Sequence, residues 1–348
     1  MFQFGAPVAL VPDYAIEAHG RTTVLIDGAM KISLVTPAGR QSRAGNRTTA
    51  VRWARILRDL GHRVEVSLDD DGRGADMMVA VHAWRSAASI EVFAATHPDR
   101  PLVVLLAGTD IYGFQHSHPE TTLASLDHAT AIVCLHDLVH RAIPRRFGKK
   151  LRVIYQSSPP LPKPREPATR HFEVCVVGHL RSEKDSLRTA YAARLMPENS
   201  RLKVVHLGQA HTKDWARDAR AEMKRNPRYD WCDEVPGWQV RRQFGRSHAM
   251  VISSVMEGGA NVVSEAITAG LPVLASDIDG NIGLLGKDYG GYYKVEDEKA
   301  LAALLHRAET DPAFLRGLGA QIRKLQPNFQ PAGEVAAWRT LLKDLKVG

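Results

Sequence analysis

The sequence predicts an α/β protein with two domains, and three observations carry this prediction. Short unbroken apolar runs alternate with segments of helical periodicity, which is the pattern of parallel sheets covered by helices on both faces. The length of 348 residues favours two domains, and a hydrophobic content of 44% is enough for two cores. Finally, five prolines crowd the stretch from Pro159 to Pro167, where neither a helix nor a central strand can continue.

The first domain is expected over residues 30–158. It follows an extension of residues 1–29 that is a loose appendage, a short hairpin or a misassigned start. After the loop at 37–47, a helix that ends at Gly61 has apolar side chains on one face and arginines on the other. Its core positions are Val51, Ala54, Leu57 and Leu60, and its outward arginines are Arg52, Arg55 and Arg58. The expected strands are 32–35, 63–67, 77–81, 102–106, 131–135 and 153–155.

Residues 159–168 are the expected interdomain linker, and residues 169–328 are the expected second domain. Its strands are expected near Val174, Val204, Val235, Ile252, Leu274 and Tyr292. In the C-terminal segment 329–348, a helix from Glu334 to Lys346 is expected to pack back on the first domain.

The composition of the chain excludes several classes of function. The formal charge of +8 and the pI near 9.4 come from scattered arginines without dense basic runs, so anionic small substrates explain them and nucleic acid is not expected. No apolar run is long enough to span a membrane, and the N-terminus lacks the basic start and long apolar core of a signal peptide. Cys134, Cys175 and Cys232 show no disulfide or metal spacing, which favours a cytoplasmic protein.

The most informative motif follows an apolar strand at 250–252. The chain runs through Gly258 and Gly259 into a helix, and a helix start exposes unpaired N–H groups and a positive dipole end that favour a phosphate anion. We expect Asn261 to be the N-cap of this helix. Glu265, about one turn later, is then placed to accept hydrogen bonds from ribose hydroxyls. The motif therefore predicts a nucleotide site.

Taken alone, Glu257 and Glu265 would more often be two solvated surface carboxylates. The surrounding sequence changes this balance, because a Glu-Gly-Gly turn, a short helix ending at Gly270 and the apolar strand 271–276 follow one another. This pattern resembles the nucleotide-sugar site of GT-B glycosyltransferases, which have two facing Rossmann-like domains with a cleft between them. Within that type it resembles retaining family 4, whose signature is Glu, seven residues and Glu. The resemblance implies that a UDP-sugar is bound by Gly178, His179, Lys184, Glu257, Gly258, Gly259, Ala260, Asn261, Val262 and Glu265.

The loop after the strand at 172–177 delivers cations at the edge of the sheet where α/β proteins bind ligands. In family 4 this loop carries an Arg directly after the Gly and a Lys five residues later. Lys184 occupies the Lys position, whereas His179 replaces the Arg and Arg181 is close enough to substitute for it. A solvated lysine is the weaker interpretation of Lys184, because a cation near a helix start opposes the helix dipole. We expect Lys184, Glu257 and Arg181 to be the catalytic residues.

The first domain is expected to hold the acceptor in the loop 36–47 and in two segments after strand ends, 81–86 and 105–112. Here Gly108-Thr109-Asp110 stands where much of family 4 has a His that touches the donor sugar. Arginine side chains suit a phosphate-like group, although each one is equally well a solvated loop residue. The expected acceptor residues are Gly39, Arg43, Gly45, Asn46, Arg47, His82, Arg85, Thr109 and Asp110.

These three segments resemble a narrower branch, the selenosugar synthases of selenoneine biosynthesis, over roughly residue 30 to the C-terminus. The resemblance implies transfer of a sugar from UDP-GlcNAc or UDP-glucose to the selenium of selenophosphate. It also implies partner enzymes that supply selenophosphate and consume the selenosugar. No cofactor and no metal ion are expected; Asp277 and Asp279 follow a strand where GT-B proteins use no metal, and His136 and His140 are interpreted as polar surface residues.

Three alternatives remain open at this point. One is a conventional family 4 transferase that adds sugar to a hydroxyl or thiol. Another is a sugar-nucleotide epimerase on the same fold, which the Glu-x7-Glu pattern disfavours. The last is a non-catalytic nucleotide-sugar-binding protein.

Overall fold

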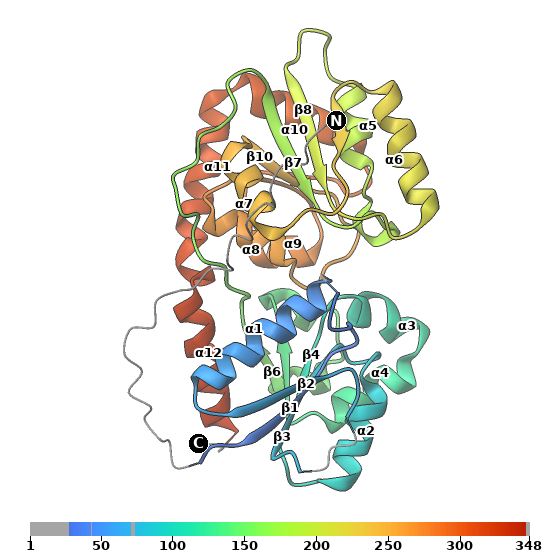
Figure 1. Cartoon of the computed structure of the whole chain (residues 1–348), viewed down its shortest axis with the longest axis vertical. Coiled ribbons are helices and arrows are strands. Elements are labelled where there is room, and N and C mark those ends of the chain that lie inside the picture. Colours follow the sequence, from blue (N-terminus) through green and yellow to red (C-terminus); the bar gives the residue numbers. More distant parts are fainter. Residues whose placement is uncertain (1–27, 43, 71–73, 346–348) are drawn as a thin grey trace, which may run out of the picture.

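The computed structural model of the chain describes residues 28–42, 44–70 and 74–345, which form two α/β domains placed one above the other (Figure 1). Most of the extension 1–29 therefore lies outside the described residues. Each domain contains one six-stranded sheet in which every strand pair is parallel. These features confirm the predicted α/β fold class.

The sheet of the first domain has the order β2-β1-β3-β4-β5-β6. All residues of the three strands β3, β4 and β5 are buried, which is why they are apolar throughout. The strands are β1 (Lys31–Val35), β2 (Arg63–Ser67), β3 (Met77–Val81), β4 (Leu102–Leu105), β5 (Ala131–Cys134) and β6 (Leu151–Val153). The helical segments are α1 (Gly45–Asp59), α2 (Ala87–Thr96), the π-helical turn η1 (Asp110–Phe114), α3 (Gln115–Ser117), α4 (Pro119–His128), η2 (Asp137–Arg141) and η3 (Arg145–Lys150).

The sheet of the second domain has the order β12-β11-β10-β7-β8-β9. Its strands are β7 (Phe172–Val177), β8 (Leu202–Leu207), β9 (Tyr229–Trp231), β10 (Ala249–Ile252), β11 (Val273–Ser276) and β12 (Tyr292–Tyr293). Its helical segments are η4 (Ser182–Lys184), α5 (Arg188–Arg194), α6 (Lys213–Arg225), α7 (Gly237–Arg246), α8 (Asn261–Thr268), α9 (Asp279–Leu285), α10 (Glu298–Thr310) and α11 (Pro312–Leu325).

The chain crosses between the domains twice. The first crossing follows β6, and the second runs through η5 (Gln326–Phe329) into α12 (Pro331–Asp344), drawn in red in Figure 1. The two crossings are joined by a backbone hydrogen bond. The N–H of Ser158 donates to the carbonyl of Phe329 at 3.1 Å, an ordinary distance for such a bond. Trp338 of α12 is fully buried in the first domain, with its ring 4.8 Å from that of Trp53.

Three sequence expectations about elements are wrong. No strand lies at Val235; the strand of that region is β9, and Val235 lies in the loop before α7. The last strand of the first domain is shifted from 153–155 to 151–153. On α1, Val51 is 49% exposed, whereas Arg52 points inward and its side chain is only 13% exposed. Periodicity placed Arg52 incorrectly because Glu334 of α12 and Asn261 of the second domain contact its guanidinium, whereas Arg55 and Arg58 are exposed as expected.

The strand order reverses once in each sheet, between β1 and β3 and between β7 and β10. Loops that leave such a point in opposite directions open a crevice at the carboxyl ends of the strands, where α/β proteins bind ligands. The two crevices belong to the two facing sheets. None of the helices in the described ranges has the length and apolar character of a membrane span.

Candidate active site

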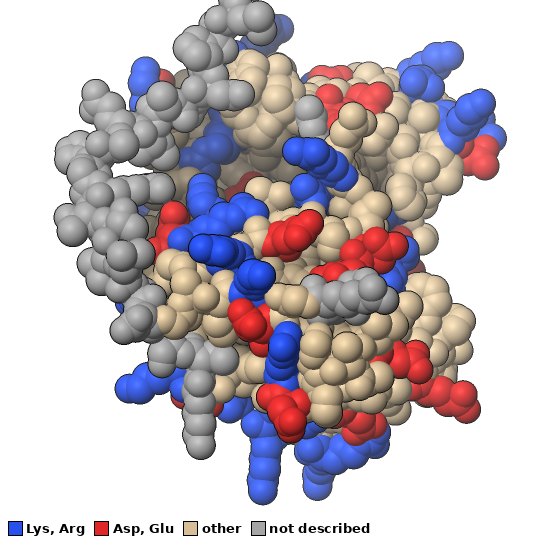
Figure 2. All heavy atoms as spheres, turned by 60° about the horizontal axis from the view of Figure 1, so that its bottom comes forward, with Lys and Arg blue, Asp and Glu red and all other residues tan. Residues whose placement is uncertain are grey.

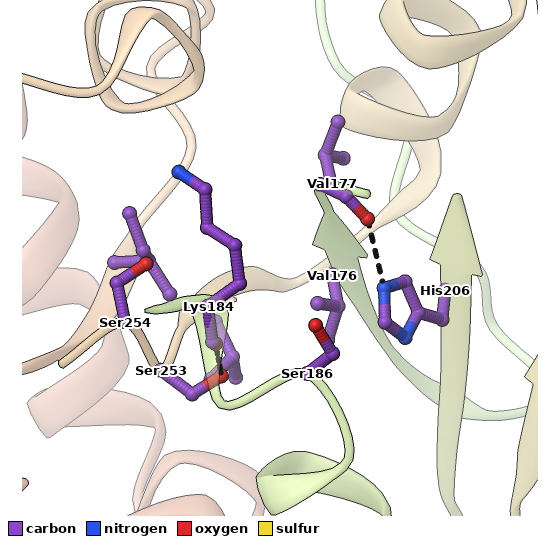
Figure 3. A pocket seen from close by; sticks show the side chains of 10 residues that line it. Val176, Val177, Lys184, Ser186, His206, Ser253 and Ser254 are labelled. Atoms are coloured by element: carbon purple, nitrogen blue, oxygen red, sulfur yellow. Dashed lines mark hydrogen bonds between the residues drawn. The ribbon is translucent and has the colours of Figure 1, made fainter. Parts of the chain in front are cut away.

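The reversal point of the second sheet contains a small pocket between the ends of β7 and β10. Figure 3 shows the Lys184 side chain extending between Ser254 on one side and Val177 and His206 on the other. The pocket is lined by Val176, Val177, Gly178, Lys184, Ser186, His206, Val251, Ile252, Ser253 and Ser254. Two sequence-predicted site residues, Gly178 and Lys184, therefore lie in the same pocket.

Lys184 and Glu257 form an ion pair across this point. The Nζ of Lys184 donates to Oε1 of the buried Glu257 carboxylate, which also accepts from Oγ of Ser254 at 2.5 Å. The Lys184 backbone is fixed as well, because Ser253 Oγ lies 3.0 Å from its carbonyl oxygen and can donate to it. The structure thus brings together two of the three predicted catalytic residues and fixes both side chains.

Gly258 and Gly259 lie against the first domain. A Cβ on Gly259, whose φ is +114°, would lie 2.5 Å from Cβ of Leu135. A Cβ on Gly108 would lie 2.5 Å from the backbone N of Gly258. Only glycine permits this approach, so these residues place the turn before α8 in direct contact with the loop after β4.

The N-cap of α8 is Ala260, and Asn261 is the first helical residue, which corrects the expectation that Asn261 is the cap. Ala260 provides no side-chain cap, so N–H groups of the first turn remain available to an anion. The Asn261 side chain is instead engaged by the first domain, because its Oδ1 accepts a hydrogen bond from Nη1 of Arg52 at 3.0 Å. The helix start at Ala260–Val262 thus lies at the domain interface.

Glu265 lies one turn into α8 and is partly buried. Burial raises the pKa of its carboxyl group, and the nearby guanidinium groups of Arg241 and Arg52 act against this rise. Within the described residues its carboxylate has no hydrogen-bond partner. A desolvated carboxylate without a donor is a site that favours hydroxyl ligands.

The Gly178 loop is held by a buried histidine that sequence reasoning missed. The Nε2–H of His206 donates to the carbonyl of Gly178 at 3.1 Å, so its Nδ1 accepts from the hydroxyl of Tyr229 at 2.9 Å. Burial lowers the pKa of His206 to about 4, which keeps the ring neutral in this arrangement. A histidine inside an apolar strand gives no signal in the sequence that distinguishes this role.

His179 and Arg181 lie on the same loop. Nδ1 of His179 accepts from the N–H of Gln209 at 3.2 Å, and its pKa is lowered by burial and by Arg181. Nε of Arg181 is buried and has no hydrogen-bond partner among the residues that the structure describes. The neutral His179 is thus occupied by the protein, while Arg181 retains a free donor for an anion.

At the reversal point of the first sheet, the loop after β1 leads into α1. Arg43 lies outside the described residues. Gly39 and Gln41 flank the exposed Arg40, and Asn46 and Arg47 lie half-buried in the first turn of α1. A Cβ on Gly45 would lie 3.8 Å from Nδ2 of Asn261, so the starts of α1 and α8 meet across the interface.

The segments after β3 and β4 are tied together by Asp110. Its fully buried carboxylate accepts from the N–H groups of Ala83 at 2.9 Å, Gly108 at 2.8 Å and two further residues. Backbone donors therefore surround the carboxylate, and Asp110 positions the two loops of the predicted acceptor site.

His82 and Thr109 form the edge of these loops. Nε2 of the buried His82 lies 2.9 Å from Oγ1 of Thr109, and burial lowers the pKa of His82. Arg85 is exposed, with its guanidinium 5.5 Å from the Phe114 ring. Phe114 in turn stacks on Trp84 with ring centroids 4.0 Å apart. An aromatic surface therefore adjoins the predicted acceptor residues.

His136 is fully buried beside the segment after β4, with its Nε2 3.5 Å from the hydroxyl of Tyr112, which corrects its interpretation as a surface residue. Its ring packs against Gly283 of α9, where a Cβ would lie 2.5 Å from Nδ1. Arg141 of η2 pairs with Asp279 at 3.3 Å next to this contact. The described residues contain no group of three or more His, Cys, Asp or Glu side chains arranged to hold a metal ion.

The face shown in Figure 2 has basic side chains gathered beside a hollow, with acidic side chains between and around them. The charge is thus distributed over this face as a mixture of both signs, which differs from the continuous basic stripe of nucleic-acid-binding surfaces.

Comparison with known proteins agrees with the fold. Residues 160–325 match the family model of glycosyl transferases group 1. HepE from Anabaena, in complex with UDP and glucose, is similar in structure with a TM-score of 0.72 and 16% identity over 91% of this chain and 99% of its own. Sucrose-phosphate synthase from Thermosynechococcus elongatus is similar with a TM-score of 0.70 and 16% identity over the same shares of 91% and 99%. No curated protein matches the chain.

The chain is thus a two-domain protein of the GT-B fold. The match to the glycosyl transferases group 1 model covers the second domain of this fold.

Proposed function

We propose that the protein transfers a sugar from a UDP-sugar to the selenium of selenophosphate. The main support for binding of the UDP-sugar donor is the reversal point of the second sheet. There Lys184, Glu257 and the uncapped start of α8 lie close together. Solved structures of similar fold contain UDP with glucose, or UDP-glucose. Those ligands are consistent with a UDP-sugar in this crevice.

In this proposal the second domain binds the whole donor. The carboxylate of Glu265 accepts the ribose hydroxyls, and Lys184, Arg181 and the N–H groups at Gly259–Val262 bind the diphosphate. Glu257 accepts hydroxyls of the sugar. The ion pair between Lys184 and Glu257 places the cation beside the leaving group in advance, so little reorganisation is required as charge develops.

The bond changes follow from these positions. The selenium of selenophosphate attacks C1 of the sugar as the bond from C1 to the diphosphate oxygen breaks, and UDP leaves with the negative charge. Water then cleaves the P–Se bond, which releases phosphate and the 1-selenosugar. A selenium nucleophile is more acidic than a thiol and arrives ionised, so no strong general base is required. Contact between Gly108 and Gly258 excludes water from C1 when the domains are closed.

The proposal that selenophosphate is the acceptor rests on the likeness of three first-domain segments to selenosugar synthases. These segments are 36–47, 81–86 and 105–112. Arg47 and Arg85 are the described arginines there that suit a phosphate-like acceptor. Pathway enzymes that supply selenophosphate and consume the selenosugar belong to the same proposal, as does a cytoplasmic location.

One observation favours the conventional family 4 alternative. The stacked rings of Trp84 and Phe114 beside Arg85 form a surface on which an organic acceptor, such as a sugar ring, packs well. That acceptor would present a hydroxyl or thiol to C1.

One assay separates these functions. The purified protein is incubated with UDP-GlcNAc or UDP-glucose, with and without selenophosphate, and the products are analysed by mass spectrometry. We expect a selenium isotope pattern on a sugar and release of UDP that depends on selenophosphate. Transfer to a hydroxyl or thiol acceptor without any selenium compound would favour the conventional transferase, and UDP binding without turnover would favour a binding protein.

A further inference from the structure

Arg52 extends from α1 of the first domain into the interface with the second. Although its position suggested a solvated residue, its side chain is only 13% exposed. Its guanidinium reaches α12 and α8, two elements that lie more than two hundred positions further along the chain. Arg55 and Arg58, one and two turns further along the same helix, are both exposed.

Glu334 at the start of α12 fixes this guanidinium. The fully buried Glu334 carboxylate accepts from Nε of Arg52 at 3.1 Å and from Nε1 of Trp53 at 2.7 Å. It also accepts from the N–H of Ser157 at 2.9 Å and from its hydroxyl at 2.5 Å. Ser157 lies in the first crossing between the domains, and Glu334 follows the second. The carboxylate that holds Arg52 therefore lies where the two crossings meet, which we call the hinge.

The other side of the guanidinium faces the proposed nucleotide site. Nη1 of Arg52 donates to Asn261 Oδ1 at 3.0 Å, and Asn261 is the first residue of α8. Nη2 is buried and has no hydrogen-bond partner among the described residues. A buried cationic donor without a partner is costly to maintain, and a bound anion or an oriented hydroxyl would satisfy it. The influence of Arg52 on the pKa of Glu265 agrees with this placement.

We infer that Arg52 is a positioning residue that holds the start of α8 through Asn261, so that nucleoside diphosphate binding and closure of the two domains stabilise each other. This inference rests on the proposed nucleotide site and adds its regulation. When the domains open, the bond from Arg52 to Asn261 breaks while the bonds to Glu334 remain within the hinge. The start of α8 then loses its orientation, and its affinity for the diphosphate falls. By linkage, a bound diphosphate favours the closed arrangement to the same extent.

The test is a double-mutant cycle on the full chain, with UDP as the probe and calorimetry as the readout. The proteins are wild type, Arg52→Ala, Asn261→Ala and the double variant, with Arg55→Ala as the control from the exposed face of the same helix. Loss of a hydrogen bond to a charged group predicts that each single variant weakens UDP binding by roughly tenfold. If both residues act through one contact, the double variant binds no more weakly than either single one. Arg55→Ala is expected to bind UDP as wild type does.

Arg52→Lys and thermal unfolding separate positioning from folding. A lysine retains the charge but cannot bond Glu334 and Asn261 at once, so its UDP affinity is expected to lie between those of wild type and Arg52→Ala. A merely structural role would lower the melting temperature of Arg52→Ala and leave the Kd of the folded protein for UDP unchanged; that result overturns the inference, as does simple additivity in the cycle. If wild type fails to bind UDP, the nucleotide site itself is wrong, which is a distinct outcome.

Discussion

The backbones of Gly108 and Gly258 meet across the domain interface. A Cβ on Gly108 would lie 2.5 Å from the N of Gly258, and a Cβ on Gly258 would overlap the backbone of Ala107 and Gly108. The loop after β4 and the turn before α8 are therefore in direct backbone contact. This contact places the acceptor side of the first domain next to the proposed donor site.

Gly258→Ala is expected to prevent full closure, because its methyl group meets backbone atoms that cannot move aside. A displacement of about 1 Å at a reacting centre predicts a loss of roughly a hundredfold in kcat/KM. Steady-state kinetics with the UDP-sugar measures this loss. Gly317→Ala in α11, where a Cβ meets no neighbour within 4 Å, is the matched control. Wild-type kcat/KM in Gly258→Ala would show that closure does not require this contact.

Lys184→Ala is expected to lower kcat by about two to three orders of magnitude, because it removes a fixed donor from the leaving diphosphate. Single-turnover release of UDP measures the chemical step directly. Lys203→Ala is the control, since Lys203 near the start of β8 pairs with Asp230 at 2.7 Å and does not line the pocket. Unchanged turnover in Lys184→Ala would remove Lys184 from the proposed site.

Glu265→Ala is expected to abolish discrimination between UDP and its 2′-deoxy analogue. Wild type is expected to prefer UDP by roughly tenfold, because a charged carboxylate gains from each ribose hydroxyl that it accepts. Calorimetric titration of wild type and of Glu265→Ala with both ligands gives, for each protein, the ratio of the two dissociation constants. The prediction is contradicted if Glu265→Ala retains the wild-type preference. Glu309→Ala, at the far end of α10, serves as the control.

Acid is expected to destabilise the protein through two buried histidines. Burial lowers the pKa of His136 and of His206 from 6.5 to about 4. Between these values the unfolded chain binds protons that the folded chain does not, so stability is lost as the pH falls from 6.5 to about 4. The loss amounts to at most about 3 kcal/mol for each histidine.

Urea unfolding at pH 7 and at pH 4.5 measures this dependence. His206→Gln is expected to be less stable than wild type at pH 7 and to lose less stability on acidification. An equal loss of stability in the variant and in wild type would contradict the assignment of His206 as a neutral, buried hydrogen-bond donor.

The sequence predicted the parts of the fold that depend on local pattern. Strands such as β3 and β10 are buried on both faces and are therefore continuous apolar runs, which are recognisable without a structure. The nearness of Lys184 to Glu257 also followed from sequence, because both residues come after parallel strands whose carboxyl ends share one edge. Parallel pairing of β7 with β10 then brings the two loops together.

What the sequence could not predict depends on contacts between distant segments. Asn261 has the chemistry of an N-cap, yet Arg52 of the other domain engages its side chain. Arg52 itself lies on the face of α1 that periodicity assigns to solvent, where Glu334 of α12 contacts its guanidinium, while Arg55 and Arg58 remain exposed. Asp110 follows a strand end, and its carboxylate accepts from the N–H groups of three residues of its own loop and from that of Ala83 in the loop after β3. The partners of Asn261 and Arg52, and the bond from Ala83 to Asp110, are fixed only by the tertiary fold.

The hydrogen bond between Ser158 and Phe329 has a mechanical consequence. It holds the two covalent connections between the domains side by side. This pair of connections, here called the strap, resists shear and twisting of one domain against the other. Rotation about the line through the strap is the motion that stretches neither connection. We therefore expect the domains to open and close by rotation about this line, with the two crevices still facing each other.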